Sequence, residues 1–185
     1  MISAIINMVE ETQKKDKDPW ESSPFKKLLT LTIDGRGRVG EEIVSRAIAT
    51  TPHKIDENIS DVNDGNKYDM KVDGKRIEIK TAYRDKSNSW QHENIYKNAG
   101  VDKVVFVDFD YDKVIMSVAS SDIIPFSERN TTFGKKATLR KSKDDGYKLD
   151  FSRTTHKNLD KAGLVKTFKS NATDKEIGEW LNNMI

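Results

Sequence analysis

Cysteine is absent from the 185 residues, which excludes disulfide bonds, thiol nucleophiles and zinc sites built on cysteine. Long apolar runs are absent too, so the sequence offers no segment suited to cross a membrane. The N-terminus, MISAIINMVEETQKK, lacks the basic start and small-residue cleavage site of a signal peptide. These absences suit a reducing cytoplasm, and we expect the protein to be cytoplasmic.

Histidine is scarce, and the sequence has neither internal repeats nor low-complexity tracts. The three histidines, His53, His92 and His156, are widely separated, and none has the spacing of a metal-binding pair. We therefore expect each histidine at the surface rather than in a metal site.

Charge is plentiful but unevenly distributed. Charged residues make up 34% of the chain and hydrophobic residues 35%, which predicts a soluble globular domain long enough to bury a core. The net charge is only +2, yet the stretch from Arg129 to Lys169 holds twelve bases and four acids, or +8, and the remainder sums to −6. A basic stretch of this size predicts an anionic partner such as nucleic acid, and a lysine-rich solvated surface is the alternative.

Apolar periodicity and turn residues predict a mixed α/β protein. Helices are expected over residues 2–10, 24–31, 35–51, 89–100 and 173–185. Strands are expected in a hairpin around residues 68–79, over 102–110 and 113–120, and in a basic hairpin over 136–152. We divide the chain into a core, residues 1–128, and a basic extension, residues 129–185, packed on the same domain.

The segment KYDMKVDGKRIEIKTA, residues 67–82, places two carboxylates side by side. Asp73–Gly74 predicts a two-residue turn whose register leaves one face of the hairpin apolar and sets Asp69 directly opposite Glu78 on the other. Like charges in that position repel. Two arrangements would relieve the repulsion, and the register alone leaves both open: a divalent cation such as Mg²⁺, or the neighbouring bases Lys71, Arg76 and Lys80.

Three glycines, Gly35, Gly37 and Gly40, have the G-x-G-x-x-G spacing of dinucleotide-binding proteins. That motif requires a buried parallel strand after the helix, whereas the segment here, TTPHKIDENISDVNDGNK, is too polar to be one. We therefore interpret the glycines as a flexible entry to the helix, with Arg36 and Arg38 placed to touch DNA phosphates.

Asp69, eight intervening residues and then Glu78-Ile79-Lys80 resemble the signature of the PD-(D/E)XK nuclease superfamily. The upstream stretch GRVGEEIVSRAI is similar to the helix that supplies a further acid in that superfamily. The resemblance covers roughly residues 36–120, with Tyr68 standing where the family has its proline. It implies a restriction-endonuclease-like core, a mixed β-sheet flanked by helices, with a basic C-terminal extension.

The resemblance also implies a site and a substrate. Asp69 and Glu78 would bind Mg²⁺, or Mn²⁺ as a substitute, with the backbone carbonyl of Ile79. Lys80 would act on the attacking water, and Glu41 would reach the site directly or through water. The implied activity is that of a type II restriction endonuclease acting on double-stranded DNA as a homodimer. A repair or recombination nuclease and a non-catalytic DNA-binding module are the alternatives.

The choice between Glu41 and Glu42 follows from helix geometry. Glu41 lies beside Val44 and Ile48 at the edge of the apolar stripe, which is where a side chain reaching a site on the sheet should be. We therefore expect Glu41, rather than Glu42, to face the site.

Further DNA contacts are expected from residue types that bind phosphates and base edges. Gln91 is one, because related nucleases place a residue near the site on the following helix. The basic stretch supplies the others, which are Lys135, Lys136, Arg140, Lys141, Arg153, Thr154, Thr155 and His156.

Overall fold

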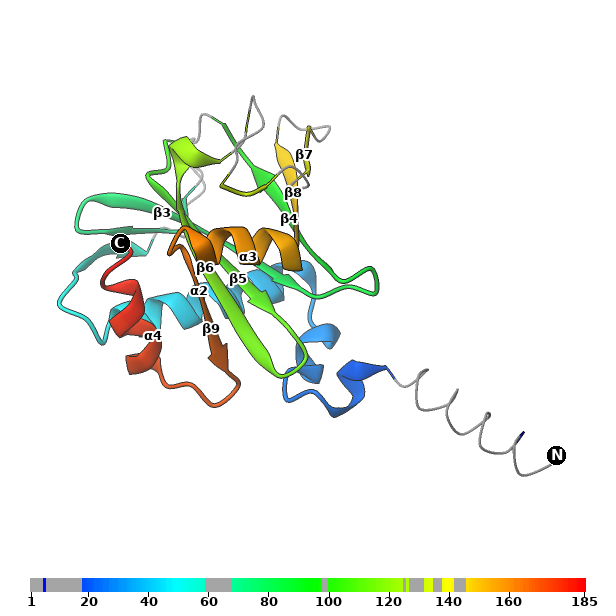
Figure 1. The fold of residues 1–185 in the computed structure, drawn as a ribbon. Coiled ribbons are helices and arrows are strands. Elements are labelled where there is room, and N and C mark those ends of the chain that lie inside the picture. Colours follow the sequence, from blue (N-terminus) through cyan, green and yellow to red (C-terminus); the bar gives the residue numbers. More distant parts are fainter. Residues whose placement is uncertain are drawn as a thin grey trace.

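The computed structural model describes Ile5 and residues 18–58, 68–97, 100–124, 126, 132–134, 138–141 and 146–185. Its main element is a six-stranded sheet with the order β1-β2-β3-β5-β6-β9 (Figure 1). The strands are β1 (Ile55–Asn58), β2 (Met70–Val72), β3 (Lys75–Tyr83), β5 (Lys103–Phe109), β6 (Lys113–Ser120) and β9 (Val165–Lys169). Only β3 and β5 run parallel, so the sheet is mixed, and the predicted α/β class with helices flanking a mixed sheet is confirmed.

One face of the main sheet packs against α2 (Ile33–Ile48) and α4 (Asp174–Leu181). Their shared core includes Val44 and Ile48 from α2, Ile77 and Ile79 from β3, and Leu181 from α4. Thr32 begins α2 by accepting a hydrogen bond from the Gly35 N–H, so Gly35 and Gly37 lie inside the helix. The flexible glycine entry is therefore wrong, because a side-chain cap starts the helix before the glycines.

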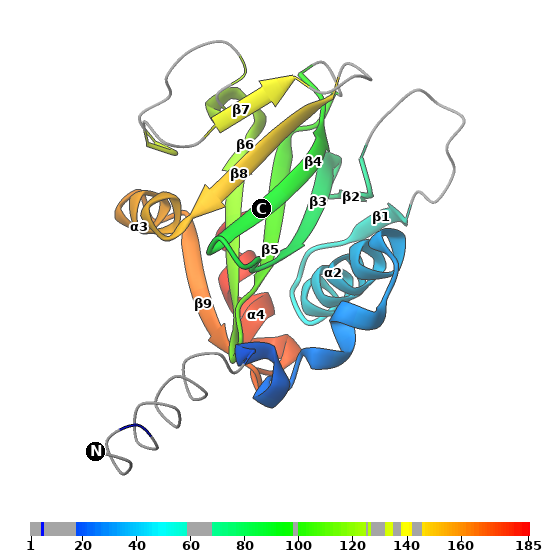
Figure 2. The ribbon, with the colours of Figure 1, turned by 90° about the vertical axis from the view of Figure 1, so that its right-hand side faces the viewer.

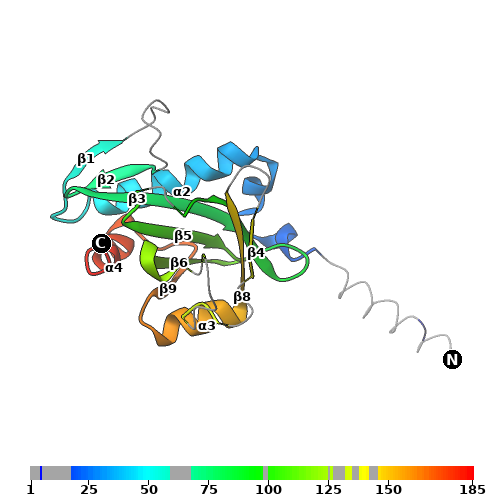
Figure 3. The same cartoon turned by 90° about the horizontal axis from the view of Figure 1, so that it is seen from above.

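The other face of the main sheet is covered by a second sheet with the order β4-β8-β7 and by α3 (Arg153–Lys161) (Figure 2). Its strands are β4 (Ser89–Ile95), β7 (Thr138–Lys141) and β8 (Tyr147–Ser152). Trp90, Phe106, Leu149 and Phe151 are fully buried between the two sheets. Figure 3 shows α2 on one side of the main sheet and β8 with α3 on the other.

Two predicted helices are not α-helices. Residues 89–95 form β4, because Trp90 and His92 point into the second core while Gln91 and Glu93 are exposed, the alternation of a half-buried strand. Residues 24–31 are covered in part by a short 3₁₀ helix, Lys26–Thr30, which follows another at Pro19–Ser22. The core order is therefore helix, hairpin, strand, strand, without the second helix that the resemblance led us to expect.

Several other predictions are confirmed. The β2–β3 hairpin turns at Asp73–Gly74, whose φ angles of 46° and 80° suit this turn, and its register pairs Met70 with Ile77. β7 and β8 pair as the predicted basic hairpin, whose turn at Asp145–Gly146 lies partly outside the described residues. Thr173 caps α4.

The C-terminal residues join the core rather than projecting from it. β9 pairs with β6 at the edge of the main sheet, and α4 packs against α2. In the described part of the chain, no helix is long and apolar enough to span a membrane.

Close packing of α2 on β3 predicts a strong effect of Gly40→Ala. An added Cβ would lie 1.9 Å from Thr81 Oγ1, so the helix or the strand must shift. We expect the free energy of unfolding to fall by about 2 kcal/mol, the usual cost of overpacking a core. Denaturant titration measures this. Gly37→Ala is the matched control, because its nearest neighbour, Glu41 Oε1, would be 3.8 Å away; it should stabilise by up to about 1 kcal/mol through helix propensity.

Candidate functional site

The predicted acidic pair lies where β2 ends and β3 continues. The Asp69 N–H donates to the Ile77 carbonyl at 2.9 Å, just beyond the last paired residues of the hairpin. The Asp69 carboxylate then accepts a 2.6 Å hydrogen bond from the Ile79 N–H. The side chain of Asp69 therefore occupies the place of a strand partner, which fixes it beside Glu78.

The Ile79 carbonyl faces the same edge as its N–H. Both main-chain groups of a strand residue point to one side, and the N–H of Ile79 is directed at Asp69. The carbonyl oxygen is thus available beside the two carboxylates, where the resemblance placed it.

Lys80 lies two residues after Glu78 on the same face of β3, and the two side chains form an ion pair. Glu78 is a buried charged residue, with 9% of its surface exposed. Burial raises the pKa of Glu78 to about 7; the nearby Lys80 lowers it, and Asp69 and Glu41 raise it further. Burial likewise raises the pKa of Asp69 and of Glu41.

These pKa shifts have one physical meaning. Three carboxyl groups share a poorly solvated region, and the single ammonium group of Lys80 does not offset them. A divalent cation would offset the remaining negative charge. The donor set therefore fits a metal ion with a preference for oxygen ligands.

The number of ligands also fits Mg²⁺. Within the described residues, no group of three or more His, Cys, Asp or Glu side chains is arranged to hold a metal ion. Mg²⁺ typically takes one or two carboxylates and keeps several waters for a phosphate substrate. Asp69, Glu78 and the Ile79 carbonyl are the groups that would hold it.

Glu41 approaches this group and Glu42 does not. Gly40 lies against Thr81 without a side chain, which lets α2 come close to β3. Glu41 is half-buried and interacts electrostatically with Asp69, Glu78 and Lys80. Glu42 is exposed on the outer side of α2, beside Arg38 and Arg46.

Some predicted DNA contacts are exposed. Arg38 lies on the outer side of α2, Gln91 on the outer face of β4, and Arg153 and Thr154 in the first turn of α3. Gln91 is not on a helix; its amide bonds to Asp85 and to Lys148.

Others are committed elsewhere or lie beyond view. The Arg36 guanidinium is 4.5 Å from the centre of the Tyr83 ring, and its Nε donates to the Leu31 carbonyl. Arg140 and Lys141 lie in β7. Lys135 and Lys136 lie outside the described residues.

Thr155 and His156 do not fit the DNA contacts predicted for them. Thr155 is 1% exposed and exchanges capping hydrogen bonds with Ser152, and His156 is 7% exposed. His156 Nε2 lies 2.7 Å from Asp108 Oδ2, and His92 Nε2 lies 3.0 Å from the other oxygen of the same carboxylate. The surface placement of His92 and His156 is therefore wrong, because the fully buried Asp108 requires polar partners.

His53 is the histidine that stays partly exposed, and its Nδ1 lies 2.6 Å from Asp73 Oδ2. The signal for the buried pair was present in the sequence. Asp108 interrupts the apolar run VVFVDFD, and a carboxylate inside a buried strand needs a distant donor.

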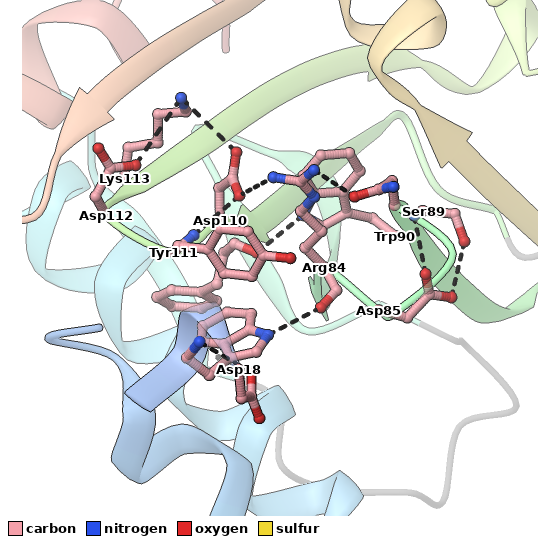
Figure 4. Close-up of polar contacts among 12 residues, drawn as sticks. Asp18, Arg84, Asp85, Ser89, Trp90, Asp110, Tyr111, Asp112 and Lys113 are labelled. Atoms are coloured by element: carbon pink, nitrogen blue, oxygen red, sulfur yellow. Dashed lines mark hydrogen bonds and ion pairs between the residues drawn. The ribbon is translucent and has the colours of Figure 1, made fainter. Parts of the chain in front are cut away.

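A buried arginine fixes the end of β3 beyond the site (Figure 4). Arg84 pairs with Asp110 at 2.9 Å, and its guanidinium lies 4.6 Å from the centre of the Tyr111 ring. The Arg84 carbonyl accepts a hydrogen bond from Trp20, and the Trp90 indole donates to the Phe109 carbonyl. These contacts tie β3, β4 and β5 to the 3₁₀ segment at Pro19–Ser22, and sequence patterns did not reveal them.

No protein-family model matches the chain, and no curated protein matches it. The function is therefore inferred from the site, since a fold shared with other proteins would not settle it.

Proposed function

We propose that the protein is a metal-dependent deoxyribonuclease with a restriction-endonuclease-like core that hydrolyses phosphodiester bonds of double-stranded DNA. One observation carries the proposal: Asp69, Glu78 and Glu41 converge on a single ammonium group, that of Lys80. Excess negative charge at a buried position costs stability, and a catalytic cation accounts for that cost.

Each residue has a chemical role in this proposal. Asp69, Glu78 and the Ile79 carbonyl hold Mg²⁺, for which Mn²⁺ substitutes. The bound ion neutralises charge on the phosphate and lowers the pKa of a coordinated water. Lys80 orients the attacking water and stabilises charge on the phosphate, and Glu41 holds water at the edge of the site.

The proposed substrate follows from the basic stretch. Arg38, Arg153, Thr154 and Gln91 are exposed, and Lys135, Lys136, Arg140 and Lys141 extend the positive charge along the chain. A compact core with one basic stretch suits a stand-alone, sequence-specific type II restriction endonuclease. Palindromic sites are cut by two-fold dimers, so we propose a homodimer.

A DNA-binding module without catalysis is the second candidate. The ion pair between Lys80 and Glu78 favours it, because such a pair is also an ordinary structural contact. Incubation with long mixed-sequence DNA and Mg²⁺ separates the candidates. Discrete fragments identify a restriction enzyme, nicks identify a repair or recombination nuclease, and intact DNA that remains bound identifies the module.

Glu41→Gln should lower the single-turnover cleavage rate at least about tenfold, since a positioned acid–base group typically contributes more than that. Glu42→Gln is the matched control and should cleave at the wild-type rate, because Glu42 is exposed on the outer side of α2. Equal rates for the two variants, or a larger loss in Glu42→Gln, contradict the role given to Glu41.

The raised pKa of Glu78 predicts how stability depends on pH without metal. A carboxyl group with a pKa of about 7 when folded and 4.5 when unfolded binds more protons in the folded state. Its contribution is therefore lost as pH rises from 4.5 to about 7, by up to about 3 kcal/mol. Urea unfolding of wild type and Glu78→Gln across this range measures the effect. The wild type should lose stability relative to the variant, and parallel curves contradict the burial of an uncompensated carboxylate.

A further inference from the structure

The outer side of α2 carries one row of alternating charges. Asp34, Arg38, Glu42 and Arg46 follow one another at four-residue intervals, which places them along one side of the helix. All four are exposed. Figure 3 shows α2 at the outer edge of the molecule, with the main sheet on its other side.

This row is not used by the fold. Within the described residues, only Arg46 of the four forms an ion pair, with Asp174 at 2.7 Å. Arg38 and Glu42 instead border an open groove with a floor made partly by Val39 and Ile43. The proposed catalytic site does not use the row either, since Glu41 points to β3 while Glu42 points outward.

The row is complementary to itself when reversed. Its signs run negative, positive, negative, positive along the chain, so an antiparallel copy presents the opposite sign at every position. Arg38 and Glu42 are equally far from position 40, and Asp34 and Arg46 are also equally far from it. A two-fold axis beside position 40 therefore sets Arg38 against Glu42 of the second copy, and Asp34 against its Arg46.

We propose that two copies of this chain associate through α2, packed antiparallel about that two-fold axis. An isologous contact of this kind is the common way for identical chains to pair. The alternation of sign also argues against DNA at this surface, because the row repels a polyanion at Asp34 and Glu42 as much as it attracts one at Arg38 and Arg46.

The size of the surface sets the expected affinity. A helix of 16 residues is about 24 Å long and presents a strip about 10 Å wide. This area is well below the roughly 800 Å² per partner of a stable interface, so the dissociation constant should be micromolar. Because opposite charges form the contact, salt should weaken it.

The contact would also reach the catalytic group. Arg38 lowers the pKa of Glu41, because its positive charge lies near that carboxyl group. Drawing the Arg38 side chain toward Glu42 of the second copy would remove part of that effect, so pairing of the chains is linked to the acid that faces Lys80.

Sedimentation analysis of the full chain, without DNA or metal, tests the proposal independently of any cleavage assay. We expect the wild type to dimerise between about 1 and about 100 μM, and the dissociation constant to rise with salt. Arg38→Glu and Glu42→Arg should each weaken self-association at least about tenfold, because each places like charges opposite each other. Lys157→Glu, an exposed charge reversal on α3, is the control and should leave the dimer unchanged.

A mixture of the two variants is the decisive arm. Equimolar Arg38→Glu and Glu42→Arg should form a heterodimer near the wild-type affinity, since opposite charges then meet at both positions. A defect within either helix would not be repaired by mixing. A wild type that stays monomeric throughout, a dimer insensitive to both reversals, or a mixture that remains monomeric overturns the proposal.

Discussion

Glu78→Gln should abolish DNA cleavage, with a loss of at least about a thousandfold in the single-turnover rate, as expected when a metal ligand that organises the reaction is removed. Glutamine keeps the shape of the side chain but loses the negative charge that would hold the cation. Asp69→Asn should have the same effect for the same reason. The measurement is quenched-flow or gel-based cleavage at saturating Mg²⁺.

Stability measurements separate this loss of activity from misfolding. Glu78 is buried with a pKa of about 7, so its neutral replacement should raise the stability of the metal-free protein above pH 7. Asp112→Asn is the control; its side chain is 79% exposed, and both activity and stability should be unchanged. Cleavage near the wild-type rate by either Glu78→Gln or Asp69→Asn would show that the acidic pair is not the catalytic centre.

Lys80→Ala should lower the cleavage rate by about two to three orders of magnitude while leaving metal binding intact. The ammonium group has no lone pair to donate, so Lys80 lies next to the metal without being a ligand. Its loss removes the positive charge that competes for Glu78, and Mn²⁺ affinity should therefore stay equal or increase.

Calorimetric titration with Mn²⁺ and single-turnover cleavage, made on the same preparation of Lys80→Ala, test both parts. Lys71→Ala is the matched control, since Lys71 is a lysine of the same hairpin, in register with Arg76 rather than with the acidic pair. Wild-type cleavage by Lys80→Ala contradicts the catalytic role. Loss of Mn²⁺ binding in that variant contradicts the separation between ligands and the positioning lysine.

The candidate site was largely predictable because it depends on local geometry. A two-residue turn at Asp73–Gly74 determines which residues of the hairpin face each other, and no distant contact is needed to bring Asp69 beside Glu78. Glu41 was predictable for a similar reason, since its position beside Val44 follows from helix periodicity alone.

The second sheet was not predictable in the same way. Residues 89–100 contain Trp90, His92 and Ile95 among polar residues, a pattern compatible with a helix or a strand. What favours the strand is pairing with β8, whose residues lie more than fifty positions later in the chain. Burial of His92 and His156 depends on the same long-range arrangement, because both bind Asp108 from different elements.

The C-terminal residues show a related limit of local patterns. Val165–Lys169 carries lysines typical of an exposed surface, yet it completes the main sheet as an edge strand, where charged residues protect against further pairing. The basic stretch therefore contains both exposed cations and structural elements of the core.

Cleavage of long bacteriophage DNA by the purified protein tests the central claim most directly, because such DNA samples many target sequences at once. The account predicts discrete fragments in the presence of Mg²⁺ or Mn²⁺, no cleavage in a chelator, and no cleavage by Asp69→Asn with either ion. Intact DNA with both ions, or cleavage that persists in the chelator or in Asp69→Asn, would contradict a metal-dependent nuclease site at Asp69 and Glu78.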